Sequence, residues 1–173
     1  MRRLAQPFLI FFCIGGLQAQ TCLVLAPAAA TSGDTVSLHL YLYSASSAPP
    51  AALQWTLQYP ASSITRITVD DGPALDAAAK TTFCAADTTG YKCLAAAANL
   101  NTIGNGIVAK ITAVLAAGIT SATLHLTDTL GASPDGQAIP ILSRDAAFNR
   151  TATDPTPHFA PKQELVRRWC SVQ

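Results

Sequence analysis

Apolar and polar residues alternate one by one along several short segments of this chain. Between residues 36 and 43, valine and leucine at the even positions alternate with serine, histidine and tyrosine at the odd positions. Residues 53–59 alternate in the same way and end at Pro60. Successive side chains of a β-strand point to opposite faces of the sheet. This period of two therefore predicts strands with one buried face and one outer face.

Further short apolar segments, separated by turn residues, occupy most of the remaining chain. They predict strands at residues 22–25, 64–69, 107–115, 122–126 and 138–142, and one strand on each side of the segment between Cys84 and Cys93. Turn signals that recur about every 8–12 residues are typical of an all-β sandwich. We therefore predict an all-β, jelly-roll-like antiparallel β-sandwich that forms one domain.

Turns are predicted where glycine, proline and aspartate gather. Asp70-Asp71-Gly72-Pro73 and Pro134-Asp135-Gly136 have this composition. The helix-like composition of residues 76–80 is too short to predict a helix. Residues 144–161 are polar and contain three prolines, which predicts a loop, and residues 163–169 have helical composition. We place the sandwich at residues 20–145, followed by a C-terminal loop and tail, or short helix, at 146–173.

The first nineteen residues have the features of a secretory signal peptide. Arg2 and Arg3 precede an apolar run at residues 7–17, and Ala19 offers a small residue at the cleavage position. The mature protein is then extracellular or periplasmic, and no later apolar run is long enough to span a membrane. A retained anchor or a buried N-terminal helix is the alternative interpretation.

Four cysteines follow the predicted signal peptide, and an even number in an exported chain predicts disulfides. Three pairings are possible. We predict Cys84–Cys93, because these residues flank a segment with a Thr-Gly turn signal, and Cys22–Cys170, which would tie the tail to the start of the mature chain. A metal site is not predicted, because the chain has no Cys-x-x-Cys and its histidines are not spaced with the cysteines as zinc ligands are. No cofactor is predicted.

The small net charge of the chain, +1 at pH 7, argues against nucleic acid as a partner. Nucleic-acid binding depends on basic residues that neutralise phosphates, and those residues normally gather into a patch or stripe.

Four segments in order carry a resemblance to a known family. They are Gly33-Asp34-Thr35-Val36, residues 52–60 with Tyr59-Pro60 at the end, Gly106-Ile107-Val108-Ala109, and Ser133-Pro134-Asp135-Gly136. Over residues 21–142 the chain resembles a cohesin domain. The resemblance implies a β-sandwich of a superfamily that includes carbohydrate-binding modules. It also implies a non-catalytic recognition domain that binds a polysaccharide, or an extracellular protein of the dockerin type, in polysaccharide degradation.

Candidate ligand-binding residues are the aromatic side chains on the predicted outer face of residues 36–43. His39, Tyr41 and Tyr43 form a stripe there, and exposed aromatic rings suit sugar binding. The alternative is that the edge of the other sheet or the C-terminal tail covers the stripe. Trp55 shares its face with Leu53 and Leu57, which predicts a core position.

Enzymatic interpretations have weaker support in the sequence. No Gly-x-Ser-x-Gly is present, and His39 and His125 fall on outward positions. Asp70 and Asp71 invite a glycosidase or calcium interpretation, but a turn explains the same residues. We predict that the chain is not an enzyme. The rival function is a structural or adhesive cell-surface protein whose edge strand accepts a partner strand. The oligomeric state is left open.

Overall fold

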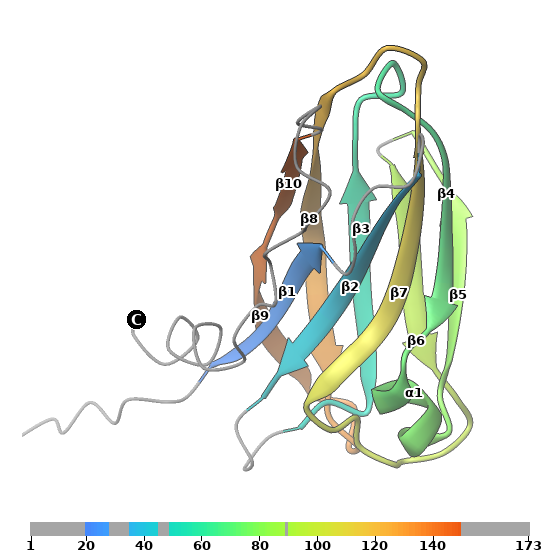
Figure 1. Cartoon of the computed structure of the whole chain (residues 1–173). Helices are drawn as coiled ribbons and strands as arrows, with labels where there is room; N and C mark the ends of the chain where they lie inside the picture. The colour runs from blue at the N-terminus through green and yellow to red at the C-terminus, as the bar shows by residue number, and fades with distance from the viewer. Residues whose placement is uncertain (1–19, 28–34, 45–48, 89, 150–173) are drawn as a thin grey trace, which may run out of the picture.

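The structure is a computed structural model that describes residues 20–27, 35–44, 49–88 and 90–149. These residues form ten strands and one short helix (Figure 1). The strands are β1 (Thr21–Pro27), β2 (Thr35–Tyr43), β3 (Ala52–Gln58), β4 (Ile64–Asp71), β5 (Thr81–Ala86), β6 (Tyr91–Ala96), β7 (Gly106–Leu115), β8 (Ser121–Ala132), β9 (Ala138–Arg144) and β10 (Ala146–Asn149). The helix is α1 (Pro73–Ala78). Each strand predicted from the sequence is present.

The strands form two layers that share β9. Sheet A has the order β4-β7-β2-β1-β9, and sheet B has the order β9-β8-β3-β6-β5, with β10 also paired to β8. The first half of β9 pairs antiparallel with β8, where Leu130 is opposite Pro140. The second half pairs parallel with β1, where Cys22 is opposite Leu142. The all-β sandwich is therefore confirmed, with one parallel pair among its antiparallel neighbours.

The core lies between the two sheets and uses the inward positions of the alternating strands. Leu38, Leu40 and Leu42 of β2 are fully buried, and so is Trp55 of β3, which confirms the core position predicted for it. Burying an aliphatic side chain of this size contributes roughly 1.5–3 kcal/mol. The alternation in the sequence thus marks the residues that hold the two sheets together.

The helix α1 corrects the prediction of a turn at residues 70–73. Asp70 and Asp71 are the last residues of β4, and Gly72 leads directly into the helix, which has proline in its first turn. A Cβ added at Gly72 would lie 2.3 Å from the Ile107 carbonyl oxygen, so the approach of β7 requires glycine there. The helix forms despite its length because Leu75 and Ala78 are buried in the core.

The strand β10 corrects the loop predicted from residue 144. Strand β9 runs to Arg144, and Ala146–Asn149 pairs antiparallel with the beginning of β8, so the paired strands extend past residue 145. Asp145 lies between the two strands. Its carboxylate accepts a hydrogen bond from the Leu126 N–H at 2.7 Å and contacts His125 Nδ1 at 2.8 Å. The Asp145 side chain thus bonds the chain to β8 between the part of β8 that pairs with β9 and the part that pairs with β10.

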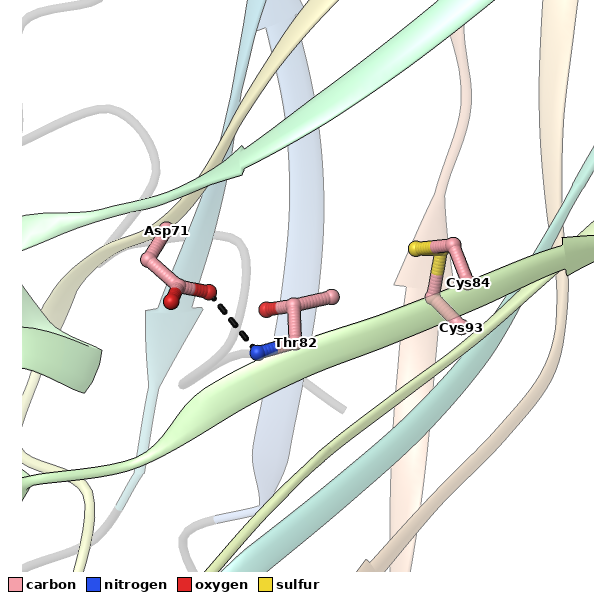
Figure 2. Close-up of a disulfide and its surroundings, with 4 residues drawn as sticks. All are labelled: Asp71, Thr82, Cys84 and Cys93. Carbon is pink, nitrogen blue, oxygen red and sulfur yellow. Dashed lines mark hydrogen bonds between the residues drawn. A yellow bond between two sulfur atoms is a disulfide. The ribbon is translucent and has the colours of Figure 1, made fainter.

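The two outermost strands, β4 of sheet A and β5 of sheet B, also meet. The Thr82 backbone N–H donates a hydrogen bond to Asp71 Oδ1 at 2.9 Å (Figure 2). Edge strands expose unpaired backbone groups to other chains. The Asp71 side chain satisfies one of these groups on β5 and brings the sandwich close to a closed barrel.

The predicted disulfide between Cys84 and Cys93 is confirmed, with a Cα–Cα distance of 4.1 Å. Cys22 is also disulfide-bonded. Its predicted partner Cys170 lies outside the described residues, so that pairing stays a prediction. The signal peptide at residues 1–19 and the helical composition at 163–169 lie outside the described residues too. Among the residues that the structure describes, no helix is long and apolar enough to cross a membrane.

Candidate functional site

A row of side chains crosses the outer face of sheet B. The strand register places Phe83 of β5 opposite Leu94 of β6, and Leu94 opposite Gln54 of β3. Gln54 is in turn opposite Leu130 of β8, and Leu130 is opposite Pro140 of β9. Paired residues of neighbouring strands point to the same face of a sheet. These five residues therefore form one continuous row, here called the Phe83 row.

The apolar members of the Phe83 row are exposed. The exposed fractions are 63% for Phe83, 44% for Leu94 and 45% for Leu130. A single exposed leucine is ordinary, but apolar side chains gathered on one face mark an interaction surface. The three residues lie on three different strands of one sheet, so they form a broad surface rather than a single protruding side chain.

Polar groups border the Phe83 row. A cleft of about 380 Å³ beside Phe83 and Leu94 is also lined by Asp87 and Lys92. Gln54 donates a hydrogen bond from Nε2 to the Asp128 carbonyl oxygen at 3.5 Å. Interfaces between proteins combine an apolar centre with a polar border of this kind.

The disulfide lies on the other side of the strands that carry Phe83 and Leu94. Cys84 follows Phe83, and Cys93 precedes Leu94, so the alternation turns both cysteines toward the core. Cys93 is buried and belongs to the hydrophobic core. The covalent link holds β5 against β6 (Figure 2). It therefore fixes the pair formed by Phe83 and Leu94.

The predicted stripe of His39, Tyr41 and Tyr43 lies on the outer face of sheet A. All three side chains are half-buried. The rings of Tyr41 and Tyr43 stack on one another, with centroids 6.2 Å apart, and His39 meets Tyr41 edge to face at 6.0 Å. The structure thus brings the three residues together, but on the sheet opposite to the Phe83 row.

Two groups of the stripe have shifted pKa values. Burial lowers the pKa of His39, and the charge of Lys110 on the neighbouring strand adds to this effect. Burial raises the pKa of Tyr43, and Tyr41 adds to this effect. Both shifts favour neutral rings. They describe a partly covered surface rather than a charged site.

His125 Nδ1 and Asp145 Oδ2 lie 2.8 Å apart, and His125 lines two open clefts of about 760 and 780 Å³. Ser63 and Ser121 line the first cleft together with His125. The hydrogen bond of the His125 ring runs to Asp145. The described residues contain no cluster of three metal-ligating side chains.

The sequence contained a signal for the Phe83 row that the predicted site did not use. If Cys84 and Cys93 are bonded and share the inner face, their neighbours Phe83 and Leu94 must point outward. Two large apolar residues that point outward side by side are unusual and indicate an interaction surface. The row across β3 and β8 could not be derived in this way, because it depends on strands that pair over long distances in the sequence.

Comparison with proteins of known structure identifies the type of fold. No protein-family model matches the chain, and no curated protein matches it. A non-cellulosomal cohesin from Archaeoglobus fulgidus is 16% identical, with a TM-score of 0.62, over 79% of this chain and 94% of that one. A cohesin from scaffoldin B of Acetivibrio cellulolyticus, solved with a Cel5 dockerin, is 13% identical, with a TM-score of 0.65, over 76% and 99%. The cohesin CaCohA2 from Clostridium acetobutylicum is 16% identical, with a TM-score of 0.60, over 80% and 96%. The chain therefore has a cohesin-like fold.

Proposed function

We propose that this chain is a non-catalytic recognition module that binds a protein partner through the Phe83 row. The observation that carries the proposal is the exposure of Phe83, Leu94 and Leu130 in one cross-strand row. Burying these side chains against a partner would remove apolar surface from water, at roughly 25 cal/mol per Å² before the costs of association. Cohesins with similar folds were solved in complex with dockerins, which supports a protein as the partner.

We also propose that the module works outside the cytoplasm, with partners that take part in polysaccharide degradation. The Cys84–Cys93 disulfide supports this location, because structural disulfides persist in oxidising compartments. The predicted signal peptide agrees with it. A dockerin-type protein is the partner class that the fold favours.

Photo-crosslinking tests the proposed surface. Phe83 is replaced by benzoyl-phenylalanine in the oxidised full chain, which is then irradiated with the secreted proteins of the source organism. A defined protein adduct is expected. The matched control carries the same probe in place of Tyr41, on the opposite sheet. Equal adducts from both positions would contradict the proposed surface.

Affinity measurements with the captured protein then distinguish specific binding at the Phe83 row from nonspecific adsorption. The captured protein is purified, and its affinity for wild type, Leu94→Ser and Leu130→Ser is measured. We expect each change to weaken binding at least tenfold, which corresponds to about 1.4 kcal/mol. Unchanged affinity in both variants would overturn the proposal.

Direct binding of a polysaccharide by His39, Tyr41 and Tyr43 is a second proposal. It is favoured by three rings that follow one strand on an outer face. Retention on immobilised polysaccharides, compared between wild type and Tyr41→Ala/Tyr43→Ala, tests it. Retention that the double variant does not reduce would contradict a site on the stripe. The alternative role, a structural protein assembled through edge strands, has less support, because Asp71 already bonds the edge of β5.

A further inference from the structure

Strand β1 is buried on both of its faces. Leu23 and Leu25 point into the core, as expected. Cys22 and Val24 point to the outer face of sheet A, yet only 4% and 5% of their surfaces are exposed. The neighbouring strand β2 alternates between buried and half-buried positions along its whole length. The outer face of β1 is therefore covered more completely than that of the strand beside it.

The apolar contacts of this outer face come from one described aromatic residue. Cys22 and Val24 form a small hydrophobic cluster of their own, and Tyr43 packs against it. The register places Leu142 of β9 on the other side of Cys22, where it forms the exposed border of the buried pair, with 44% of its surface exposed. Cys22, Val24, Tyr43 and Leu142 define an apolar strip, here called the β1 strip. The burial that raises the pKa of Tyr43 agrees with a covered strip.

The bonding of Cys22 points to what covers the strip. Cys22 is disulfide-bonded, while Cys84 and Cys93 are bonded to each other. The chain has two further cysteines, Cys13 and Cys170. Cys13 falls within the predicted signal peptide, so Cys170 is the cysteine that remains in the mature chain.

The length and composition of the C-terminal segment fit this assignment. Strand β10 ends at Asn149, and the residues between it and Cys170 could span roughly 70 Å when extended, so reach does not limit the contact. Val166 and Trp169 closely precede Cys170 in the sequence. The broad indole ring of a tryptophan suits an apolar strip bordered by a tyrosine and a leucine.

We infer that the C-terminal segment 163–170 docks on the β1 strip, held by a Cys22–Cys170 disulfide and packed through Trp169. Disulfide geometry brings the two Cα atoms to within about 4.4–6.8 Å, so the bond alone would bring Trp169 next to the strip. The segment then occupies the Tyr43 end of the aromatic stripe. Docking there leaves the His39 and Tyr41 end of the stripe open to a polysaccharide, and it leaves the Phe83 row on the opposite sheet open to a protein partner. The inference is independent of the function proposed for that sheet.

Tryptic mapping without reduction tests the covalent part. Cleavage after Arg168 separates Cys170 from the chain before it. Cleavage after Lys92 separates Cys84 from Cys93. Peptide 169–173 is expected in a disulfide with the peptide that contains Cys22. The Cys84–Cys93 linkage serves as the internal control. Peptide 169–173 with a free thiol, or bonded elsewhere, would overturn the inference.

Hydroxyl-radical footprinting of the full chain tests the docking itself. In Trp169→Ala/Cys170→Ser, labelling of Tyr43 and Val24 is expected to rise several-fold over wild type, while labelling of Phe83 on the opposite sheet stays the same. Unchanged labelling of Tyr43 would overturn the docking even if the disulfide is present. An increase at Phe83 of the same size would also overturn it, because it would indicate general unfolding.

Discussion

The Asp71 carboxylate of β4 accepts a hydrogen bond from the backbone N–H of Thr82 on β5 at 2.9 Å. The two strands come from different sheets and are the last members of the strand order. One side chain thus bonds the two free edges of the sandwich, at a place where no backbone ladder joins them.

Replacing Asp71 with alanine should destabilise the fold by about 1–3 kcal/mol, because the partly buried N–H of Thr82 would lose a charged acceptor. Urea denaturation measures this change. Asp70→Ala is the matched control, since Asp70 is exposed and opposite Lys110, and it should change stability by less than about 0.5 kcal/mol. Equal losses in both variants would show that the bond to Thr82 has no special role.

Removing the disulfide in Cys84→Ala/Cys93→Ala should cost about 2–3 kcal/mol, the loop-closure entropy of a ten-residue loop. Guanidinium denaturation of the oxidised wild type and of the double variant gives the difference. Hydrogen exchange should rise most in β5, because among the described strands β5 forms a ladder with β6 alone. Exchange that rises equally in β2 would contradict a local role for the disulfide.

Gly72→Ala should lower stability by roughly 1–3 kcal/mol, because the added methyl group would meet the Ile107 backbone at 2.3 Å. Gly104→Ala is the control, since nothing lies within 4 Å of a Cβ at that position. Thermal unfolding of the two variants measures the contrast. A Gly72→Ala protein as stable as Gly104→Ala would mean that β7 and the start of α1 are not in close contact.

His39 should make stability depend on pH below its ordinary pKa of 6.5. Burial and Lys110 lower the pKa of His39 in the folded state, so the unfolded chain binds its proton first as the pH falls. This contribution to stability is therefore present above pH 6.5 and is lost as the pH falls through the lowered pKa. The urea midpoint should fall less between pH 7.5 and pH 5 in His39→Gln than in wild type. Parallel pH profiles would exclude a contribution from His39.

The predicted strands and core followed from local patterns. Alternation along residues 36–43 and 53–59 correctly indicated which side chains face the core, including Trp55. Helix α1 was not predicted, because its six residues carry too little periodicity, and it forms through the burial of Leu75 and Ala78. Strand β10 was not predicted, because its sequence is weakly apolar and its pairing with β8 begins only after the Asp145 contact.

The candidate site was harder to predict from the sequence than the fold. The stripe of His39, Tyr41 and Tyr43 lies along one strand, so alternation alone could place it. The Phe83 row lies across strands, and its members are neighbours only through the register of β5, β6, β3 and β8. A row of this kind depends on strand order, which local patterns do not contain.

The shared strand β9 has a mechanical consequence. Thr21 to Val24 of β1 pair in parallel with Ile141 to Arg144 of β9. A force that pulls Thr21 and Arg144 apart draws the two strands past each other along their length. The hydrogen bonds between them are then loaded together in shear, instead of opening one after another like a zipper. The sandwich is built to resist tension between its first strand and the end of β9.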